Sequence, residues 1–138
     1  MSNPDNPFSS MMSGAGTETS TKTQRQFARF QVSWRVSLVF GSGANRVVYR
    51  GSSYDISMGG LCFRSENNIP HKEEGSLLLL LPAQHMNEMS QPLEIRSQVV
   101  YSAFSKGAFR IGVKFNEFKP GDRAILDARL RHLAAKMS

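Results

Sequence analysis

The clearest pattern in the chain is an alternation of apolar and polar side chains over residues 30–40. The even positions carry apolar residues, namely Phe30, Val32, Trp34, Val36, Leu38 and Phe40. A period of two is typical of a β-strand that buries one face in the core. The glycine-rich residues 41–45 predict a turn. Residues 46–55 predict the returning strand, so the first two strands are expected to form a hairpin.

A compact polar bend follows the second strand. Tyr54 and Ile56 share one parity, whereas Asp55 and Ser57 share the other. Because alternate residues of a strand point to opposite faces, we expect Tyr54 and Ile56 to face the core. The carboxylate and the hydroxyl would then point outward together. Two glycines come next, and they permit a sharp bend or the close approach of a ligand.

Three further segments after the bend have the pattern of strands. The leucine run at residues 76–81 predicts a strand covered on both faces. Alternation over residues 93–103 and 109–115 predicts two more strands, joined by a hairpin turn at Ser105, Lys106 and Gly107. With a short strand starting at Leu61, the chain offers six or seven antiparallel strands.

The hydrophobic period changes near the C-terminus. Pro120 suits the first position of a helix, and Asp122 suits the positive end of the helix dipole. Apolar residues then recur at three- and four-residue spacing: Ile125, Leu126, Leu130, Leu133 and Met137. This spacing predicts an amphipathic helix over about residues 120–137. Short antiparallel strands followed by one helix predict a small β-barrel with the helix packed against it.

Composition adds a polar N-terminus and a basic remainder. Residues 1–22 are rich in Ser, Thr, Gly, Asn and Pro, which predicts a disordered tail ahead of one domain at 23–137. The whole chain has a net charge of +6. Residues 1–24 contribute −1, so the remaining residues carry +7. Such a charge fits an anionic partner, namely a nucleotide, a nucleic acid, an acidic protein or membrane headgroups, and it equally fits a charge that serves solubility alone.

Several function classes lack the residues that they need. Cys62 is the only cysteine, which excludes an intrachain disulfide or a cysteine cluster for zinc. The longest apolar run, residues 77–81, is far shorter than the ~20 residues of a membrane span. His71, His85 and His132 have no metal-ligand spacing, and no nucleophile–base pair stands out. We therefore expect a cytoplasmic protein without membrane insertion, cofactor or enzymatic activity.

Two polar patches suggest a nucleotide site. Arg25 and Arg29 lie four residues apart, just before the first strand. A guanidinium group can bond the O6/N7 edge of guanine or grip phosphate oxygens. Asp55 can accept hydrogen bonds from N1–H and N2–H₂ of guanine, and Ser57 can contact the sugar, the phosphate or the base edge. We expect the two patches to meet and to bind a doubly charged, guanine-containing nucleotide.

Together, the two patches resemble the motifs of the PilZ domain family. Arg25 and Arg29 match the family's RxxxR motif, and Asp55, Ser57 and Gly60 match its D/N-x-S-x-x-G motif. A third segment, FRIGVKF near the C-terminus, also fits the family, and the similarity covers roughly residues 22–135. The ligand-binding residues that this resemblance implies are Arg25, Arg29, Asp55, Ser57, Gly59 and Gly60.

The resemblance implies a fold and a function. The fold would be a six-stranded antiparallel barrel at about residues 29–116 followed by the C-terminal helix. The ligand would be bacterial cyclic di-GMP, with the arginine segment wrapping over it and the second motif reading a guanine. Gln24 precedes the first arginine, and this position influences whether one ligand or a stacked pair binds. Binding would order the arginine segment and pass the signal to a downstream protein.

Two other functions remain open at this point. The chain could be a PilZ-fold interaction protein for pilus, flagellar or exopolysaccharide machinery that acts without nucleotide. A basic small barrel could also hold single-stranded nucleic acid on exposed aromatic rings. The second option is disfavoured because Phe30, Trp34, Phe109 and Phe115 all occupy core-parity positions.

Overall fold

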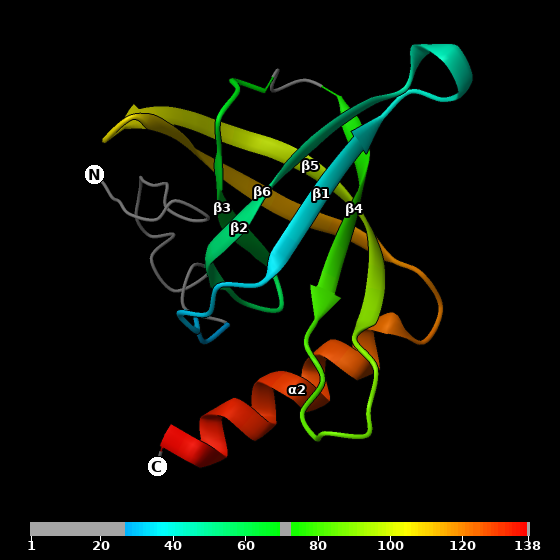
Figure 1. Ribbon diagram of the computed structural model, residues 1–138, viewed down its shortest axis with the longest axis vertical. Helices are drawn as coiled ribbons and strands as arrows, with labels where there is room; N and C mark the ends of the chain where they lie inside the picture. Colours follow the sequence, from blue (N-terminus) through cyan, green and yellow to red (C-terminus); the bar gives the residue numbers. More distant parts are fainter. Residues whose placement is uncertain (1–26, 70–72, 138) are drawn as a thin grey trace.

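Six antiparallel strands close into a barrel in the order β1-β2-β3-β6-β5-β4, and one helix lies across one end (Figure 1). This computed structural model describes residues 27–69 and 73–137. The strands are β1 (Arg35–Phe40), β2 (Val47–Ile56), β3 (Gly60–Ser65), β4 (Glu74–Leu81), β5 (Gln91–Ser105) and β6 (Ala108–Phe118). A short 3₁₀ helix, η1 (Gly43–Asn45), joins β1 to β2, and α2 (Asp122–Met137) is the C-terminal helix. The predicted fold class is confirmed.

The alternating segment forms one wall of the core. Trp34, Val36, Leu38 and Phe40 are all buried, in agreement with the predicted inward face. The regular strand is shorter than predicted, because β1 begins only at residue 35. Phe30 is also buried, but it joins the sheet through an isolated bridge. The segment between this bridge and β1 therefore runs along the barrel without belonging to a regular strand.

The leucine-rich strand β4 is covered on one face only. Leu77, Leu79 and Leu81 are fully buried, whereas Leu78 is 37% exposed and Leu80 is half-buried. The prediction of a strand covered on both faces was wrong. A barrel wall is a single layer, so the outer side of β4 faces away from the core.

The end of β2 departs from simple alternation. The pairing of β2 with β3 shifts between Ser53 and Asp55, which leaves Tyr54 as the extra residue of a bulge. As a result Ser53 is buried. Ser57 is also buried, where its hydroxyl bonds within the bend, so the prediction that Asp55 and Ser57 point outward together was wrong. Tyr54 also differs from prediction, because it packs against Arg110 and is absent from the core.

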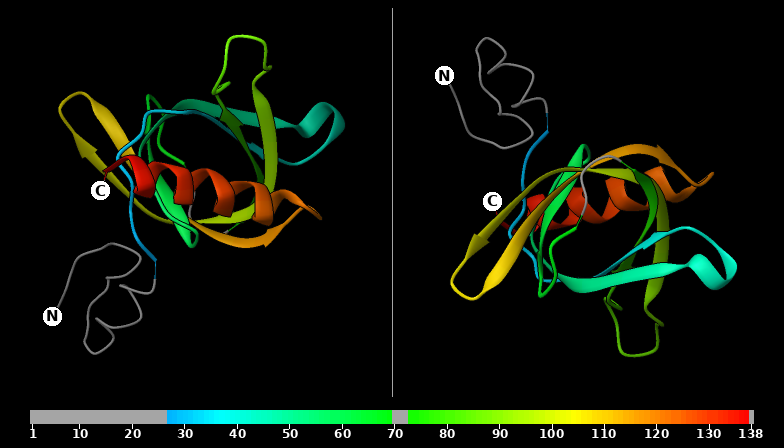
Figure 2. Two further views of the ribbon diagram at one scale, coloured as in Figure 1. Left: turned by 90° about the horizontal axis from the view of Figure 1, so that it is seen from below. Right: turned by 90° about the horizontal axis from the view of Figure 1, so that it is seen from above.

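The β5–β6 hairpin has a two-residue turn that extends beyond the barrel (Figure 2). Lys106 has φ 53° and Gly107 has φ 83°, and positive φ at both positions is the mark of a type I′ turn. The predicted turn is confirmed. Phe109, expected in the core, is only half-buried, and its ring packs edge-to-face on the exposed Phe104 at 5.1 Å.

Helix α2 closes one end of the barrel. Leu126 and Leu130 are buried in the same core as the strands. The helix begins at Asp122, two residues later than predicted, and the Asp122 carboxylate accepts a hydrogen bond from the Glu94 backbone N–H at 2.8 Å. Within the described ranges, no helix is long and apolar enough to cross a membrane.

Candidate functional site

A backbone bridge brings one of the predicted arginines to the polar bend. Phe30 N–H donates to the Ile56 carbonyl at 2.8 Å, and Ile56 N–H donates back to the Phe30 carbonyl at 2.9 Å. These bonds place Arg29 and Asp55 side by side, close enough for the Arg29 charge to act on the Asp55 carboxyl group. Arg25 lies outside the described residues, so its place in the site stays a prediction.

Asp55 is the most unusual polar group of the site. Its Oδ1 atom is buried and has no hydrogen-bond partner among the described residues. Burial raises the pKa of Asp55, and the positive charges of Arg29 and Arg110 oppose that rise. A buried acceptor without a donor costs free energy, so this oxygen is prepared to accept a hydrogen bond from a ligand.

The side chain of Tyr101 lies across β6 and reaches β3, the strand that pairs with Asp55. The row Asp55–Cys62–Gly112–Tyr101 crosses β2, β3, β6 and β5 in register. A pairing shift between Val99 and Tyr101 moves the tyrosine out of the predicted core parity. A Cβ atom on Gly112 would lie 2.1 Å from the Tyr101 ring, so the ring rests directly on the glycine. The Tyr101 hydroxyl reaches Cys62 Sγ at 3.2 Å.

This packing makes Cys62 a structural residue. The residue is 1% exposed, and burial raises the pKa of its thiol to about 11. The thiol is therefore protonated at neutral pH and is a poor nucleophile. Burial likewise raises the pKa of Tyr101, which stays a neutral hydroxyl. The floor of the site beside Asp55 thus carries no charge of its own.

Arg110 is a second cation at the site, and the sequence reasoning did not identify it. Its guanidinium carbon lies 4.3 Å from the centre of the Tyr54 ring, in cation–π geometry. Its charge also acts on Asp55. The outward parity of Arg110 beside the buried Ile111 was visible in the sequence. Its proximity to Asp55 depends on the order of strands in the barrel, which the sequence did not show.

The glycines and Ser57 shape the bend itself. The Ser57 hydroxyl accepts a hydrogen bond from Gly59 N–H at 3.1 Å and donates to the Gly60 carbonyl at 3.3 Å. A Cβ atom on Gly59 would lie 2.9 Å from the Phe27 ring, so this glycine permits the incoming segment to pack closely. The Gly59 carbonyl accepts a hydrogen bond from Phe115 N–H at 2.9 Å. Ser57 is buried and holds the bend, and its contact with a ligand stays a prediction.

The charged groups around the bend are mostly positive. Arg29, Arg64 and Lys114 are exposed, and Arg110 stands directly opposite Arg64 on the neighbouring strand. In the described ranges, no three His, Cys, Asp or Glu side chains form a group that could hold a metal ion. A buried acceptor among arginines suits an anionic molecule that also carries N–H donors.

Comparison with protein families identifies this architecture. The family model described as the PilZ domain matches residues 23–132, which is most of the chain. The protein belongs to the PilZ domain family. Membership confirms the resemblance given by the two motifs, and it places Arg29 and the bend within the matched region. No curated protein sequence matches the chain.

Solved PilZ structures share the fold at low sequence identity. The inhibitor of motility MotI/DgrA of Bacillus subtilis is 21% identical with a TM-score of 0.62, over 83% of this chain and 53% of that one. The PilZ domain of Escherichia coli YcgR with c-di-GMP is 14% identical with a TM-score of 0.59, over 83% of this chain and 94% of that one. The K. pneumonia MrkH–c-di-GMP complex is 16% identical with a TM-score of 0.55, over 82% and 52%. The chain thus spans about half the length of MotI and MrkH.

Proposed function

We propose that this PilZ domain is a receptor for cyclic di-GMP. The observation that carries the proposal is the buried Asp55 Oδ1, which lacks a partner among the described residues and lies near two arginines. Guanine offers two adjacent donors, N1–H and N2–H₂, and the dinucleotide carries two phosphate charges. Support also comes from the YcgR and MrkH structures, both of which contain c-di-GMP.

Each group has a proposed role that follows from its position. Asp55 accepts the guanine donors, and this contact satisfies its buried oxygen. Arg29, together with Arg25, binds phosphate oxygens or the O6/N7 edge of the base. Arg110 adds a positive charge on the opposite side of Asp55. Ser57 contributes indirectly, because its hydroxyl fixes the glycine bend beside which the base would lie.

Calorimetric titration with cyclic di-GMP tests the proposal. We expect wild-type protein to bind with micromolar or better affinity. Arg25→Ala, Arg29→Ala and Asp55→Ala should each weaken binding by roughly tenfold or more, since one bidentate contact is worth about 1–3 kcal/mol. Arg46→Ala is the matched control, because Arg46 is exposed next to η1, outside the site. Cyclic di-AMP should bind more weakly than cyclic di-GMP, because adenine lacks the N1–H and N2–H₂ donors.

Two outcomes would overturn this assignment. One is the absence of measurable binding by folded wild-type protein, which would favour an interaction protein that acts without nucleotide. The other is unchanged affinity in both Arg29→Ala and Asp55→Ala, which would move the ligand to another surface. Circular dichroism of each variant separates lost binding from lost fold.

We further propose that ligand binding signals to a downstream protein by ordering the arginine segment over the bend. Arg29 lies one residue before the Phe30 bridge, which ties this part of the chain to the bend. Amide NMR during the titration should show the signals of residues 20–29 shifting together with those of Asp55 and Gly59. Shifts confined to the bend, with none in the arginine segment, would contradict this mechanism.

A further inference from the structure

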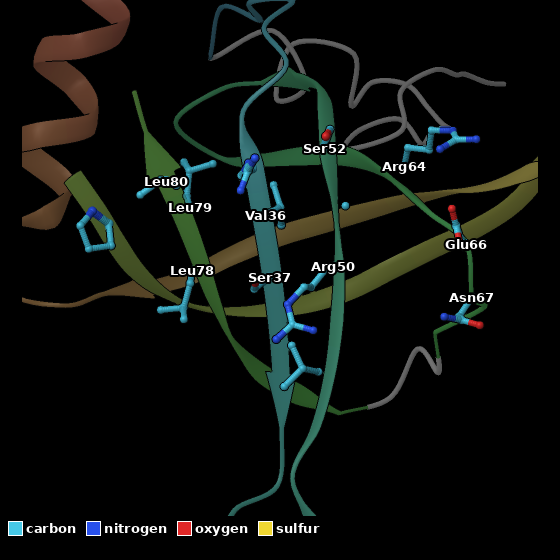
Figure 3. Close-up of a pocket in the computed structure, with 14 residues that line it drawn as sticks. Val36, Ser37, Arg50, Ser52, Arg64, Glu66, Asn67, Leu78, Leu79 and Leu80 are labelled. Atoms are coloured by element: carbon cyan, nitrogen blue, oxygen red, sulfur yellow. The ribbon is translucent and has the colours of Figure 1, made fainter. Parts of the chain in front are cut away.

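A groove of about 820 Å³ lies on the barrel wall formed by β1, β2 and β4. Figure 3 shows Leu78 and Leu80 to one side of β1, and Ser52 and Arg64 to the other. The groove shares Arg64 with the basic face described above, but none of Arg29, Asp55 and Arg110 lines it. It is therefore a separate surface from the proposed nucleotide site.

Three arginines surround one exposed serine in this groove. Ser52 on β2 pairs with Arg35 of β1 on one side and with Arg64 of β3 on the other. Directly paired residues of neighbouring strands share a face, so all three side chains point outward. Arg50 lies two residues before Ser52 on the same face of β2, and its side chain lies over β1 (Figure 3). The groove is therefore lined by three arginines whose strands lie within about two strand spacings, ~10 Å between backbones.

The described part of the chain does not neutralise these arginines. Both of its ion pairs lie elsewhere, between Arg96 and Glu74 and within α2. Arg35, Arg50 and Arg64 form no ion pair or side-chain hydrogen bond with any described residue, and Glu66 is the one carboxylate that lines the groove. Three exposed arginines against one carboxylate leave the groove positively charged, which suits an acidic partner.

The opposite wall of the groove is apolar. Leu78, Leu80 and Pro92 line it, and Leu78 is 37% exposed. Leu80 and Pro92 are paired across β4 and β5, so their side chains form one continuous strip. A surface with an apolar strip on one side and arginines on the other matches an amphipathic segment with the same division.

We propose that this groove binds an acidic amphipathic segment of a partner protein. Leucine-type side chains of the partner would cover Leu78, Leu80 and Pro92, while its Asp or Glu carboxylates would pair with the arginines around Ser52. A single-stranded nucleic acid is less suited to this surface. It needs aromatic stacking platforms, and no aromatic ring is among the residues that line the groove. The inference rests on the groove alone and does not depend on nucleotide binding.

Fluorescence anisotropy with synthetic peptides tests the proposal on the full chain without nucleotide. The probe is a labelled, Ala-rich helical peptide of about 16 residues, with Leu at i, i+3, i+4 and i+7 and a few Glu residues on the opposite face. One comparison peptide has Gln in place of every Glu, and another has the same composition in scrambled order. We expect saturable binding of the acidic amphipathic peptide only, weakening steeply as salt rises from about 50 to 300 mM.

Charge-reversal variants locate the binding surface. Arg50→Glu and the milder Arg50→Ala should weaken peptide binding by roughly tenfold and severalfold, respectively. Leu78→Ser should weaken it without changing its salt dependence. Arg46→Glu is the matched control, because it carries the same charge change on an exposed residue outside the groove. Amide NMR should show peptide-induced shifts at Ser37 and Ser52, which line the groove.

Several results would overturn the proposal. The Gln peptide or the scrambled peptide could bind as tightly as the acidic amphipathic one. Arg46→Glu could weaken binding as much as Arg50→Glu, which would indicate general attraction to a basic protein. Finally, a dT oligonucleotide could displace the peptide by binding the groove more tightly. That result would assign the surface to nucleic acid. Thermal melts confirm that each variant is folded.

Discussion

Asp55 combines a cost to folding with a benefit to binding. Its Oδ1 atom is buried without a donor among the described residues, and desolvation raises the pKa of the carboxyl group despite two nearby arginines. A buried carboxylate oxygen without a hydrogen-bond donor is destabilising in the free protein. The same group becomes favourable once a ligand supplies N–H donors. Binding sites commonly hold such locally unfavourable groups. Removing them improves stability at the expense of function.

We predict that Asp55→Asn stabilises the free protein while it weakens cyclic di-GMP binding. The folded-state pKa is raised above the ordinary Asp value of 3.8, so the folded protein holds more protons than the unfolded chain in the window above 3.8. The free energy of unfolding of the wild-type protein therefore falls as pH rises through that window. The variant has no carboxyl group at this position, so its stability does not fall in this way. The two melting temperatures should agree at low pH and differ by a few degrees at neutral pH. A melting temperature lower in the variant at neutral pH would contradict this account.

The contact of Tyr101 with Gly112 gives a second prediction at residue scale. A Cβ atom on Gly112 would lie 2.1 Å from the tyrosine ring, so Gly112→Ala must displace the ring and its contact with Cys62. We expect a loss of about 1–3 kcal/mol in the free energy of unfolding. In a Tyr101→Ala background the same substitution should cost much less, because the ring is gone. Urea denaturation of the four proteins measures this coupling, and simple additivity would show that the ring is not the obstacle.

At the scale of elements, a buried hydroxyl helps to hold the segment before β1 against β2. Ser53 Oγ accepts a hydrogen bond from Trp34 N–H at 2.9 Å and donates to the Val32 carbonyl. Ser53 N–H donates in turn to the Trp34 carbonyl at 2.9 Å. These bonds attach the segment that carries Arg29 to β2, so the bulge that buries Ser53 also helps to position the site.

Ser53→Ala should therefore destabilise the fold by about 1–3 kcal/mol, the cost of leaving a buried donor and acceptor unsatisfied. Ser52→Ala is the matched control, since the neighbouring Ser52 is exposed and should change stability by less than ~0.5 kcal/mol. Chemical denaturation measures both values. Equal effects of the two substitutions would show that the Ser53 hydroxyl does not hold the segment.

The sequence predicted the strands better than it predicted the irregularities within them. Period-two alternation was enough to place Val36 and Leu38 in the core, because burial of one face is a local property of a strand. The bulge at Tyr54 places Ser53 and Ile56, three residues apart, both in the interior, so the alternation read back from Ile56 predicted the wrong side for Ser53 and Tyr54. The outward position of Leu78 was missed because a run of identical leucines carries no parity.

Only part of the candidate site could be predicted from the sequence, for a similar reason. The motifs predicted that Arg29 and Asp55 would meet, and the Phe30–Ile56 bridge brings them together. Arg110 and Tyr101 were missed because their place beside Asp55 depends on β6 lying between β3 and β5. Strand order is a property of the closed barrel, and alternation along one strand does not encode it.

At the scale of the whole molecule, a row of arginines connects the two proposed binding surfaces. Arg35, Ser52, Arg64 and Arg110 occupy directly paired positions on β1, β2, β3 and β6. Paired positions lie about 4.8 Å apart from strand to strand, so the row runs around the outside of the barrel from the groove to the nucleotide site. Arg64 is the shared member, because it lines the groove and stands opposite Arg110.

This position predicts a distinctive behaviour for Arg64→Gln. Two like charges directly opposite each other on neighbouring strands repel, and an anion bound on either side relieves that repulsion. Removing the Arg64 charge should therefore weaken both cyclic di-GMP and the acidic peptide by severalfold, because each loses a nearby cation. Arg46→Gln, with the same charge change beside η1, should leave both affinities unaltered. Titrations of each variant with each ligand at one salt concentration measure the effect. If Arg64→Gln weakened only one ligand, the two surfaces would be electrostatically independent and the row would carry no link between them.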